Sequence, residues 1–253
     1  MSQAAGGGPP PQFDCFGLTE MGPEDDVNDD CFAVEPALGL FLVADGMGGR
    51  PAGARASSIT TETFLEQLKR LDAPARVEEA QLRRILAQAH ENVRGAAAAD
   101  PSLSGLGTTL SAVVFHGAGG KMVHVGDSRI YRLRGGQLSQ LSRDHTLAAE
   151  IAEREKVAPE DSQLPFRHML SRYVGSDTPL EPDVAAVELE PGDWLVLTTD
   201  GVSKAMKRAQ MEKLLAARKA PTAESLCRDI MDATREVRPE DDVTAVVLGL
   251  AGN

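Results

Sequence analysis

The sequence has few cysteines, no long apolar run and fewer basic than acidic residues. Its three cysteines, Cys15, Cys31 and Cys227, are widely spaced and form no Cys-x-x-Cys pair, which argues against a disulfide framework and against a structural zinc site. No segment approaches the roughly 18 consecutive apolar residues of a membrane span, and residues 1–12 have neither the basic nor the apolar region of a signal peptide. We therefore expect a soluble, cytoplasmic protein that does not act at a membrane.

Acidic residues outnumber basic ones across the 253-residue chain. Lys and Arg total 26 and Asp and Glu total 38, so the formal net charge is −12. Nucleic acids and anionic membrane surfaces attract basic proteins, and neither is therefore an expected partner. The hydrophobic fraction of 42% supports one sizeable core. We expect a monomer with a flexible Gly- and Pro-rich tail at 1–12 and a single domain at 13–253.

The pattern of apolar residues predicts an α+β protein. Short apolar runs with strand composition, separated by turns rich in Gly or Pro, lie at 31–34, 38–44, 108–115, 121–125, 129–133, 137–141, 184–189, 194–199 and 243–250. Helices are predicted at 52–71, 77–98, 146–156, 210–218 and 222–235. We expect a hairpin over 31–44, one antiparallel meander over 108–141, and a surface flap over 145–177.

Aspartates stand at the ends of several predicted strands. Asp45, Asp127 and Asp200 each follow an apolar strand and adjoin a glycine, and Asp241 and Asp242 precede the last strand. If these strands share a sheet, the carboxylates can converge on a cation. The ligands would then be oxygens only, which favours Mg²⁺ or Mn²⁺. A single Asp-Gly is more often a plain turn, so this prediction depends on the four strand ends together.

A second acidic group precedes the strand at 31–34. Asp29 and Asp30 close the segment 20–30, which contains six acids and no base. Such a run is ordinarily a solvated, charged loop. Because this one leads directly into an apolar strand, it can equally supply further ligands to the same cation.

Six short motifs occur in a fixed order along the chain. They are Val43-Ala-Asp45-Gly46-Met47-Gly48-Gly49, Gly105-Leu-Gly107-Thr108-Thr109, Val125-Gly126-Asp127-Ser128-Arg129, Asp144-His145-Thr146, Thr199-Asp200-Gly201-Val202 and Asp241-Asp242-Val243-Thr244. Together, over residues 19–250, they resemble the metal-dependent protein phosphatase 2C family in its bacterial form. The resemblance implies a four-layer α-β-β-α sandwich, in which two antiparallel β-sheets are flanked by helix pairs.

The resemblance also implies a centre that holds two Mn²⁺ or Mg²⁺ ions. On the matching positions, Asp45 would bridge the two ions and the backbone carbonyl of Gly46 would bind one of them. Asp200 and Asp241 would complete the ligand set of the first ion. Asp45, Asp200 and Asp241 are therefore the expected catalytic residues.

Three further acids match secondary positions of that centre. Asp29 and Asp30 occupy the place of an acidic pair that serves the second ion, directly or through water. Asp127 would hold a third ion, as in bacterial members of the family. These three residues complete the set of expected metal ligands.

The implied reaction is hydrolysis of phosphoserine and phosphothreonine in proteins by water that the metal ions activate. The cysteines lack the Cys-x5-Arg loop of cysteine phosphatases, so no nucleophilic side chain is expected. The expected partners are phosphorylated proteins, among them serine/threonine kinases and their substrates. The alternative is a catalytically weak relative that acts as a regulatory phosphoprotein-binding module.

Several positions depart from the family pattern or leave a role open. Asp25 stands where members usually carry an arginine that grips the substrate phosphate. Arg50 and Arg172 are the substrate-binding candidates to replace it, although Arg50 can equally be a solvated loop residue. Asp242 replaces a usual asparagine. His145 is expected to be structural rather than catalytic.

Overall fold

A computed structural model describes residues 12–23, 26–49, 51–71, 77–116, 119–156 and 168–251. Of the predicted tail at 1–12, only Gln12 is among them, and Asp25 and Arg50 also lie outside the described residues. Within these ranges, none of the helices is long and apolar enough to cross a bilayer.

One sheet contains five antiparallel strands in the order β1-β11-β10-β7-β8. They are β1 (Phe13–Glu20), β7 (Arg129–Arg134), β8 (Gln137–Gln140), β10 (Trp194–Thr198) and β11 (Val243–Leu250). Sequence analysis did not predict β1, which pairs along its whole length with β11 at the other end of the chain. Its sequence combines glycine and two acids with apolar residues, so the strand signal is weak without knowledge of the partner strand.

The second sheet has the order β2-β3-β5-β6-β9, and the short β4 pairs with β3. Its strands are β2 (Asp30–Glu35), β3 (Leu40–Met47), β4 (Gly107–Thr108), β5 (Leu110–His116), β6 (Gly119–Val125) and β9 (Asp183–Glu188). The predicted hairpin over 31–44 is confirmed as β2 and β3, with a 3-10 turn at Pro36–Leu38 between them. A second 3-10 turn, Pro101–Leu103, follows the second helix.

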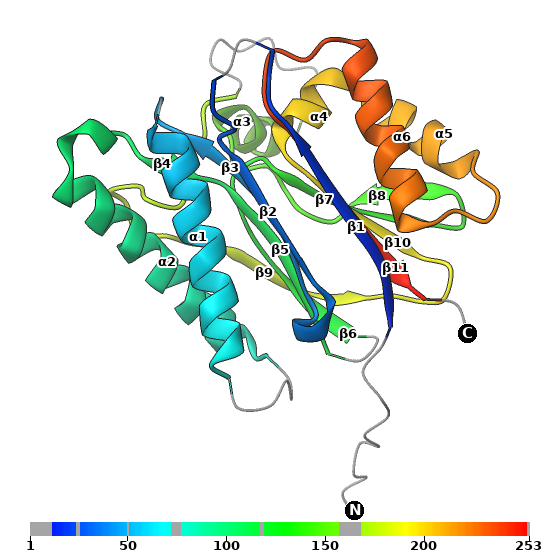
Figure 1. The fold of residues 1–253 in the computed structure, drawn as a ribbon, viewed down its shortest axis with the longest axis horizontal. Helices are drawn as coiled ribbons and strands as arrows, with labels where there is room; N and C mark the ends of the chain where they lie inside the picture. Colours follow the sequence, from blue (N-terminus) through cyan, green and yellow to red (C-terminus); the bar gives the residue numbers. More distant parts are fainter. Residues whose placement is uncertain are drawn as a thin grey trace, which may run out of the picture.

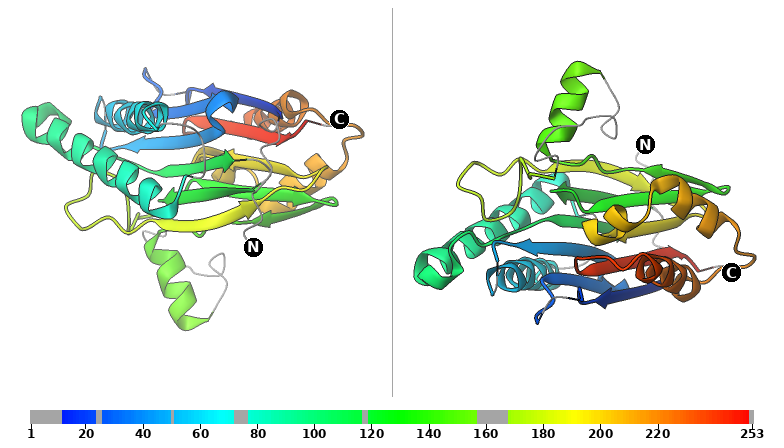
Figure 2. Two further views of the ribbon diagram at one scale, coloured as in Figure 1. Left: turned by 90° about the horizontal axis from the view of Figure 1, so that it is seen from below. Right: turned by 90° about the horizontal axis from the view of Figure 1, so that it is seen from above.

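Two helix pairs cover the outer faces of the sheets. Helices α1 (Ala52–Lys69) and α2 (Glu79–Ala99) cover the second sheet, whereas α5 (Arg208–Ala216) and α6 (Ala223–Glu236) cover the first. Figure 1 shows the pairs on opposite sides of the strands. The flap helix α3 (Leu147–Glu155) projects from the layers in Figure 2, and α4 (Asp200–Ala205), which was not predicted, directly follows β10. The four-layer α+β sandwich is confirmed.

Three apolar clusters form the core of the described part of the chain, one between each pair of neighbouring layers. Strand β3 illustrates how the sequence produces them, because successive side chains of a strand point to opposite faces. Leu40 and Leu42 belong to the cluster beneath α1 and α2, whereas Phe41 and Val43 belong to the cluster between the two sheets. A continuous apolar run is therefore the pattern of a strand that is buried on both faces.

The predicted single meander over 108–141 is wrong. β5 pairs with β6 and β7 pairs with β8, but β6 and β7 lie in different sheets. The chain crosses between the sheets at residues 126–128, where Gly126 has a φ of 107°, a backbone conformation that favours glycine. Apolar alternation does not identify the neighbouring strand, so the sequence could not reveal this crossing. Its effect is to place Asp127 between the two sheets at one end of the sandwich.

Candidate metal centre

Among the described residues, five carboxylates gather at the end of the sandwich where β3 and β10 terminate and β2 and β11 begin. Asp30 on β2 lies opposite Asp45 on β3 in the strand register. Asp200 follows β10, and Asp241 precedes its antiparallel neighbour β11. Asp127 lies in the connection between β6 and β7. The fold thus brings the predicted strand-end acids together.

Burial and mutual repulsion oppose the ionisation of Asp30, Asp45, Asp127 and Asp200. Burial, and then the charges of Asp200, Asp30, Asp127 and Asp241, raises the pKa of Asp45 well above its usual range. Burial is also the main cause that raises the pKa of Asp30 and of Asp127 to about 8. A divalent cation among these side chains would relieve the repulsion and favour their ionised forms.

The donor atoms of the group suit a hard cation. Among the described residues, Oδ1 of Asp200 is a buried acceptor without a hydrogen-bond partner, which is unfavourable unless a ligand satisfies it. The gathered side chains offer only carboxylate oxygens, the ligands that Mg²⁺ and Mn²⁺ prefer. In the part of the chain that the structure describes, no group of three or more Asp, Glu, His or Cys side chains is so placed that it could hold a metal ion without rearrangement. Two of the carboxylates instead contact a lysine.

Lys204 bridges these two carboxylates. Its Nζ lies 2.7 Å from Oδ2 of Asp200 and 2.8 Å from Oδ2 of Asp241. Burial alone lowers the pKa of Lys204, but the two carboxylates raise it to a net value above the ordinary one. Sequence analysis missed this residue. The signal was its spacing of four from Asp200, which is typical of an ion pair on a helix, but α4 itself was not predicted.

Gly46 allows the acidic segment, β3 and α1 to meet. A Cβ at this position would lie 2.2 Å from the carbonyl oxygen of Gly53 and 2.6 Å from that of Asp29, so a larger residue does not fit. The N–H of Gly46 donates to the Asp29 carbonyl. Oδ1 of Asp29 accepts from the N–H of Ala54 at 3.0 Å, near the start of α1. Asp29 therefore also holds the N-terminal turn of this helix, a role that the sequence did not indicate.

Two threonines fix the backbone of Asp45. Oγ1 of Thr108 and the N–H of Thr109 donate to the Asp45 carbonyl at 2.8 and 2.9 Å. The N–H of Asp45 donates to Oγ1 of Thr109 at 3.0 Å, and Oγ of Ser128 lies 2.6 Å from that same oxygen. The Gly-Thr-Thr and Asp-Ser-Arg motifs therefore position Asp45 through its main chain.

Asp242 ties the acidic segment to the start of β11. Its Oδ1 accepts from the N–H of Gly22 at 2.7 Å, and its Oδ2 accepts from the N–H of Asp29 at 2.6 Å. The side chain is buried. Because both oxygens accept from N–H groups, a carboxylate suits this position better than an asparagine amide, which offers one acceptor. The departure from the usual asparagine thus has a structural reason in this chain.

His145 links the base of the flap to Gly126 and to Asp183. Its Nδ1 accepts from the N–H of Gly126 at 3.2 Å, and its Nε2 lies 3.2 Å from Oδ2 of Asp183. Arg172 donates to Oδ1 of Asp183 at 3.3 Å and to the carbonyl of Glu181 at 3.1 Å. The structure therefore places Arg172 on the flap base, and its contact with substrate stays a prediction.

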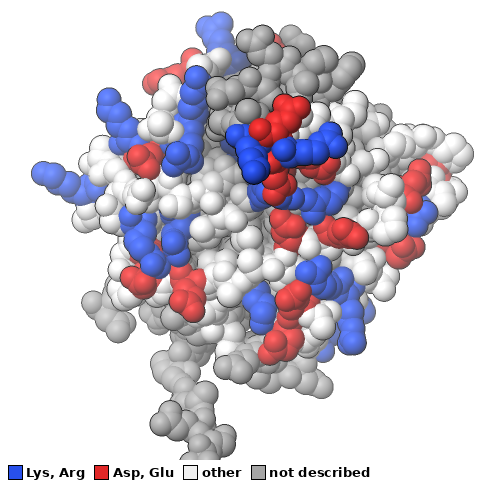
Figure 3. All heavy atoms as spheres, turned by 180° about the vertical axis from the view of Figure 1, so that it is seen from behind, with Lys and Arg blue, Asp and Glu red and all other residues white. Residues whose placement is uncertain are grey.

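Acidic and basic side chains are mixed on the face of the molecule opposite to that of Figure 1. Figure 3 shows this face, on which Lys and Arg side chains lie among Asp and Glu side chains. Surface acids form ion pairs along helices, such as Glu79 with Arg83 and Glu224 with Arg228. The carboxylates of the candidate metal centre differ because they face one another.

Comparisons with known proteins agree with the site and the fold. A family model described as Protein phosphatase 2C matches residues 23–242. The serine/threonine phosphatase stp of Listeria monocytogenes is 31% identical over 183 residues, which cover 71% of this chain and 73% of that protein. The serine/threonine protein phosphatase PstP of Mycobacterium tuberculosis is 34% identical over 219 residues, 82% of this chain and 40% of PstP. A solved structure of the PstP catalytic domain with two manganese ions has a TM-score of 0.83 and 25% identity, covering 95% of this chain and 99% of that one.

Proposed function

This chain belongs to the protein phosphatase 2C family, and we propose that Asp45, Asp200 and Asp241 are the residues on which its catalysis depends. It is a metal-dependent protein serine/threonine phosphatase that uses Mn²⁺ or Mg²⁺. The observation that carries the residue assignment is the gathering of carboxylates around Asp45, whose pKa is raised first by burial and then by their charges. The phosphatase relatives favour an enzyme over the alternative of a regulatory binding module.

We assign the first ion to Asp45, Gly46, Asp200 and Asp241. Asp45 would bind both ions, and the carbonyl of Gly46 would bind one of them. Asp200 and Asp241 would complete the ligand set of the first ion. When bound, the ions screen the phosphoryl oxygens and lower the pKa of water. The carboxylates hold the ions, and the hydrogen bonds of Thr109 to Asp45 keep this ligand in place.

The remaining acids have secondary roles in this proposal. Asp30 lies beside Asp45 and accepts hydrogen bonds at Oδ2 from the hydroxyls of Thr199 and Thr244, at 2.8 and 2.6 Å. We assign Asp30 and Asp29 to the second ion, directly or through water. Asp127, whose pKa the charge of Asp200 helps to raise, is assigned to a third ion.

For the substrate phosphate we propose Arg50 and Arg172. Arg50 lies outside the described residues, and the support for it is its sequence position directly after the Gly48-Gly49 pair that follows Asp45. Arg172 lies at the base of the flap, where it donates a hydrogen bond to Asp183. A guanidinium suits a phosphate because it can donate two parallel hydrogen bonds.

The substrates are phosphorylated proteins, and we propose serine/threonine kinases and the targets of those kinases as the specific ones. The support is the name of the relatives stp and PstP, which are serine/threonine phosphatases. We propose a cytoplasmic location, supported by free thiols at Cys15, Cys31 and Cys227, which a reducing compartment maintains. A monomer is the expected form.

The proposed function is tested by hydrolysis of p-nitrophenyl phosphate and of a phosphothreonine peptide, with Mn²⁺ and then with excess EDTA. We expect release of phosphate that requires the metal and that is lost in Asp45→Ala. Asp232→Ala removes an exposed surface acid of α6 and serves as the matched control, with turnover unchanged. Metal-dependent turnover at the wild-type level in Asp45→Ala contradicts the residue assignment.

A further inference from the structure

Lys204 joins two segments that are remote in sequence. It lies in α4, one helical turn after Asp200, and its Nζ contacts Oδ2 of Asp200 at 2.7 Å and Oδ2 of Asp241 at 2.8 Å. Asp241 is 37 residues further along the chain, just before β11. The ammonium therefore lies between the two carboxylates that, in the proposed function, complete the first ion.

The ammonium and a divalent ion oppose each other at these carboxylates. An ion held by Asp200 and Asp241 would lie close to Nζ, and like charges a few ångströms apart repel each other. The lysine can leave, because its charge is carried on a flexible four-carbon stem and its side chain is 39% exposed. The two carboxylates stay near their places, since Asp200 begins α4 directly after β10 and Asp241 directly precedes β11.

We propose that Lys204 competes with the first metal ion for Asp200 and Asp241, so that ion binding must displace the ammonium. This inference rests on the proposed function, which assigns both aspartates as ligands. One consequence is that the centre binds Mn²⁺ less tightly than the same carboxylates would without the lysine. The other is that Lys204 stabilises the protein at low metal concentration, because it neutralises part of the repulsion among the acids.

The direct test is calorimetric titration of the full chain with Mn²⁺. Lys204→Gln is expected to bind the first ion about five- to thirtyfold more tightly, because it lacks a competing hydrogen-bonded ion pair. Lys204→Arg keeps the positive charge and is expected to bind like the wild type. Lys213→Gln removes the same charge from an exposed position of α5, and its affinity is expected to change less than about twofold, because salt screens distant charges.

Thermal unfolding gives a readout that does not depend on turnover. In EDTA, Lys204→Gln is expected to melt below the wild type, because Asp200 and Asp241 lose their cation. On addition of Mn²⁺ its Tm is expected to rise more than that of the wild type. Lys204→Met repeats both measurements in case the glutamine variant does not fold.

Two outcomes separate this inference from the proposed function. Equal or weaker Mn²⁺ binding by the neutral Lys204 variants overturns the competition. Wild-type Mn²⁺ binding by Asp200→Ala shows instead that the ligand assignment is wrong, whatever the lysine variants do. Tighter binding by the lysine variants together with weaker binding by Asp200→Ala supports both.

Discussion

Strand β10 has a carboxylate near each end, and the two side chains have opposite surroundings. Asp193 precedes the strand, where Nε of Arg134 donates to its Oδ1 at 2.9 Å and the N–H of Glu190 donates to its Oδ2 at 2.8 Å. Asp200 follows the strand, and among the described residues its Oδ1 has no hydrogen-bond partner. Both side chains are largely buried, so burial alone does not distinguish them.

The pKa values of the two groups move in opposite directions. Burial raises the pKa of Asp193, but the hydrogen bonds of Arg134 and Glu190 outweigh it, so the net pKa is lowered. Burial also raises the pKa of Asp200, and although Lys204 lowers it in part, the net pKa is raised. A buried acid with complete partners stabilises a fold, whereas one without them indicates a ligand site.

The largest expected effect is on turnover at the Asp200 end. Asp200→Asn removes one negative ligand with little change of shape, so Mn²⁺-dependent turnover is expected to fall on the order of a thousandfold, the size of effect that metal ligation supplies. Steady-state kinetics on a phosphothreonine peptide measure it, with Asp193→Asn as the control from the other end of β10. A loss of less than tenfold in Asp200→Asn would contradict the proposal that Asp200 is a metal ligand on which turnover depends.

The next effect is on stability at the Asp193 end. Asp193→Ala removes the buried carboxylate that accepts from Arg134 and from the N–H of Glu190, although Arg134 keeps its ion pair with Glu190. We expect the free energy of unfolding to fall by about 2 kcal/mol, the contribution of lost hydrogen bonds to a charged group. Urea unfolding in EDTA measures this loss, while turnover of the folded variant at low temperature is expected to match the wild type. Arg134→Met combined with Asp193→Ala is expected to cost less than the sum of the single changes, because the two side chains interact. Additive losses would contradict the pairing.

Asp241 and Asp242, which precede β11, allow a second comparison between an acid that stabilises the fold and one proposed to bind the metal. Asp242→Asn sets an amide NH₂ against a backbone N–H of Gly22 or Asp29, and we expect a loss of about 2 kcal/mol in EDTA. Asp241 is partly exposed and contacts Lys204, so Asp241→Asn is expected to change the stability in EDTA much less and to weaken Mn²⁺ binding instead. Equal stability losses in the two variants would show that both acids serve the fold alone.

The pH dependence of stability in EDTA separates the two kinds of acid. In the folded protein the pKa of Asp30 and of Asp127 is raised to about 8, so the native state binds more protons than the unfolded state between pH 4 and 8. Stability is therefore expected to fall as the pH rises through this range, by up to about 1.4 kcal/mol per pH unit for each extra proton. The lowered pKa of Asp193 acts in the opposite sense, because its contribution is lost as the pH falls below about 4.

Buried histidines also titrate, so they restrict the pH range in which the effect of the carboxylates on stability can be measured. Burial lowers the pKa of His124 to about 4 and also lowers that of His145, so both destabilise the protein as the pH falls below about 6.5. The carboxylates are therefore measured between pH 6.5 and 8.5, by urea unfolding with and without Mn²⁺. Stability that rises with pH across this window in EDTA would contradict the repulsion inferred for the centre.

Local sequence features account for most of what could be predicted. The apolar run at 41–43 indicates a buried strand because the pattern depends only on consecutive residues, and the same holds for Asp45 and Asp200 as acids at strand ends. The resemblance to a family supplied the four-layer arrangement that these local features leave open. It also supplied the pairing of ligands with ions, which stays a prediction here.

Long-range pairing accounts for what could not be predicted. The partner of β1 is the last strand of the chain, with Phe13 opposite Leu250, and Asp242 contacts the backbone of Asp29 over a separation of 213 residues. Neither pairing leaves a periodic signal in the sequence. The contact of Lys204 with Asp241 leaves no such signal either, since the two residues are 37 positions apart.

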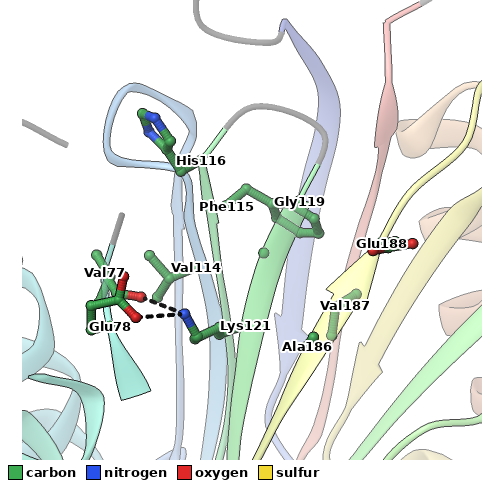
Figure 4. A pocket seen from close by; sticks show the side chains of 11 residues that line it. Val77, Glu78, Val114, Phe115, His116, Gly119, Lys121, Ala186, Val187 and Glu188 are labelled. Carbon is green, nitrogen blue, oxygen red and sulfur yellow. Dashed lines mark hydrogen bonds and ion pairs between the residues drawn. The ribbon is translucent and has the colours of Figure 1, made fainter. Parts of the chain in front are cut away.

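The smallest effect is expected at Lys121, which lies at the other end of the sandwich from the metal centre. It lines a pocket of about 370 Å³, and Figure 4 shows it between Val77 and Glu78 on one side and Ala186 and Val187 of β9 on the other. Its Nζ contacts the Val77 carbonyl at 3.3 Å and Oε2 of Glu78 at 3.4 Å. These contacts are longer than those of Lys204, and the Glu78 side chain is 60% exposed.

Lys121→Met is therefore expected to change stability by less than about 0.5 kcal/mol, as for an exposed ion pair, and to leave both turnover and Mn²⁺ affinity unchanged. Lys121→Met and Lys204→Gln each remove one positive charge, at opposite ends of the sandwich, so their Mn²⁺ affinities can be compared directly. If both variants bound Mn²⁺ more tightly by the same factor, the net charge of the protein would explain the gain. A gain confined to Lys204→Gln assigns it to the contacts of that lysine with Asp200 and Asp241.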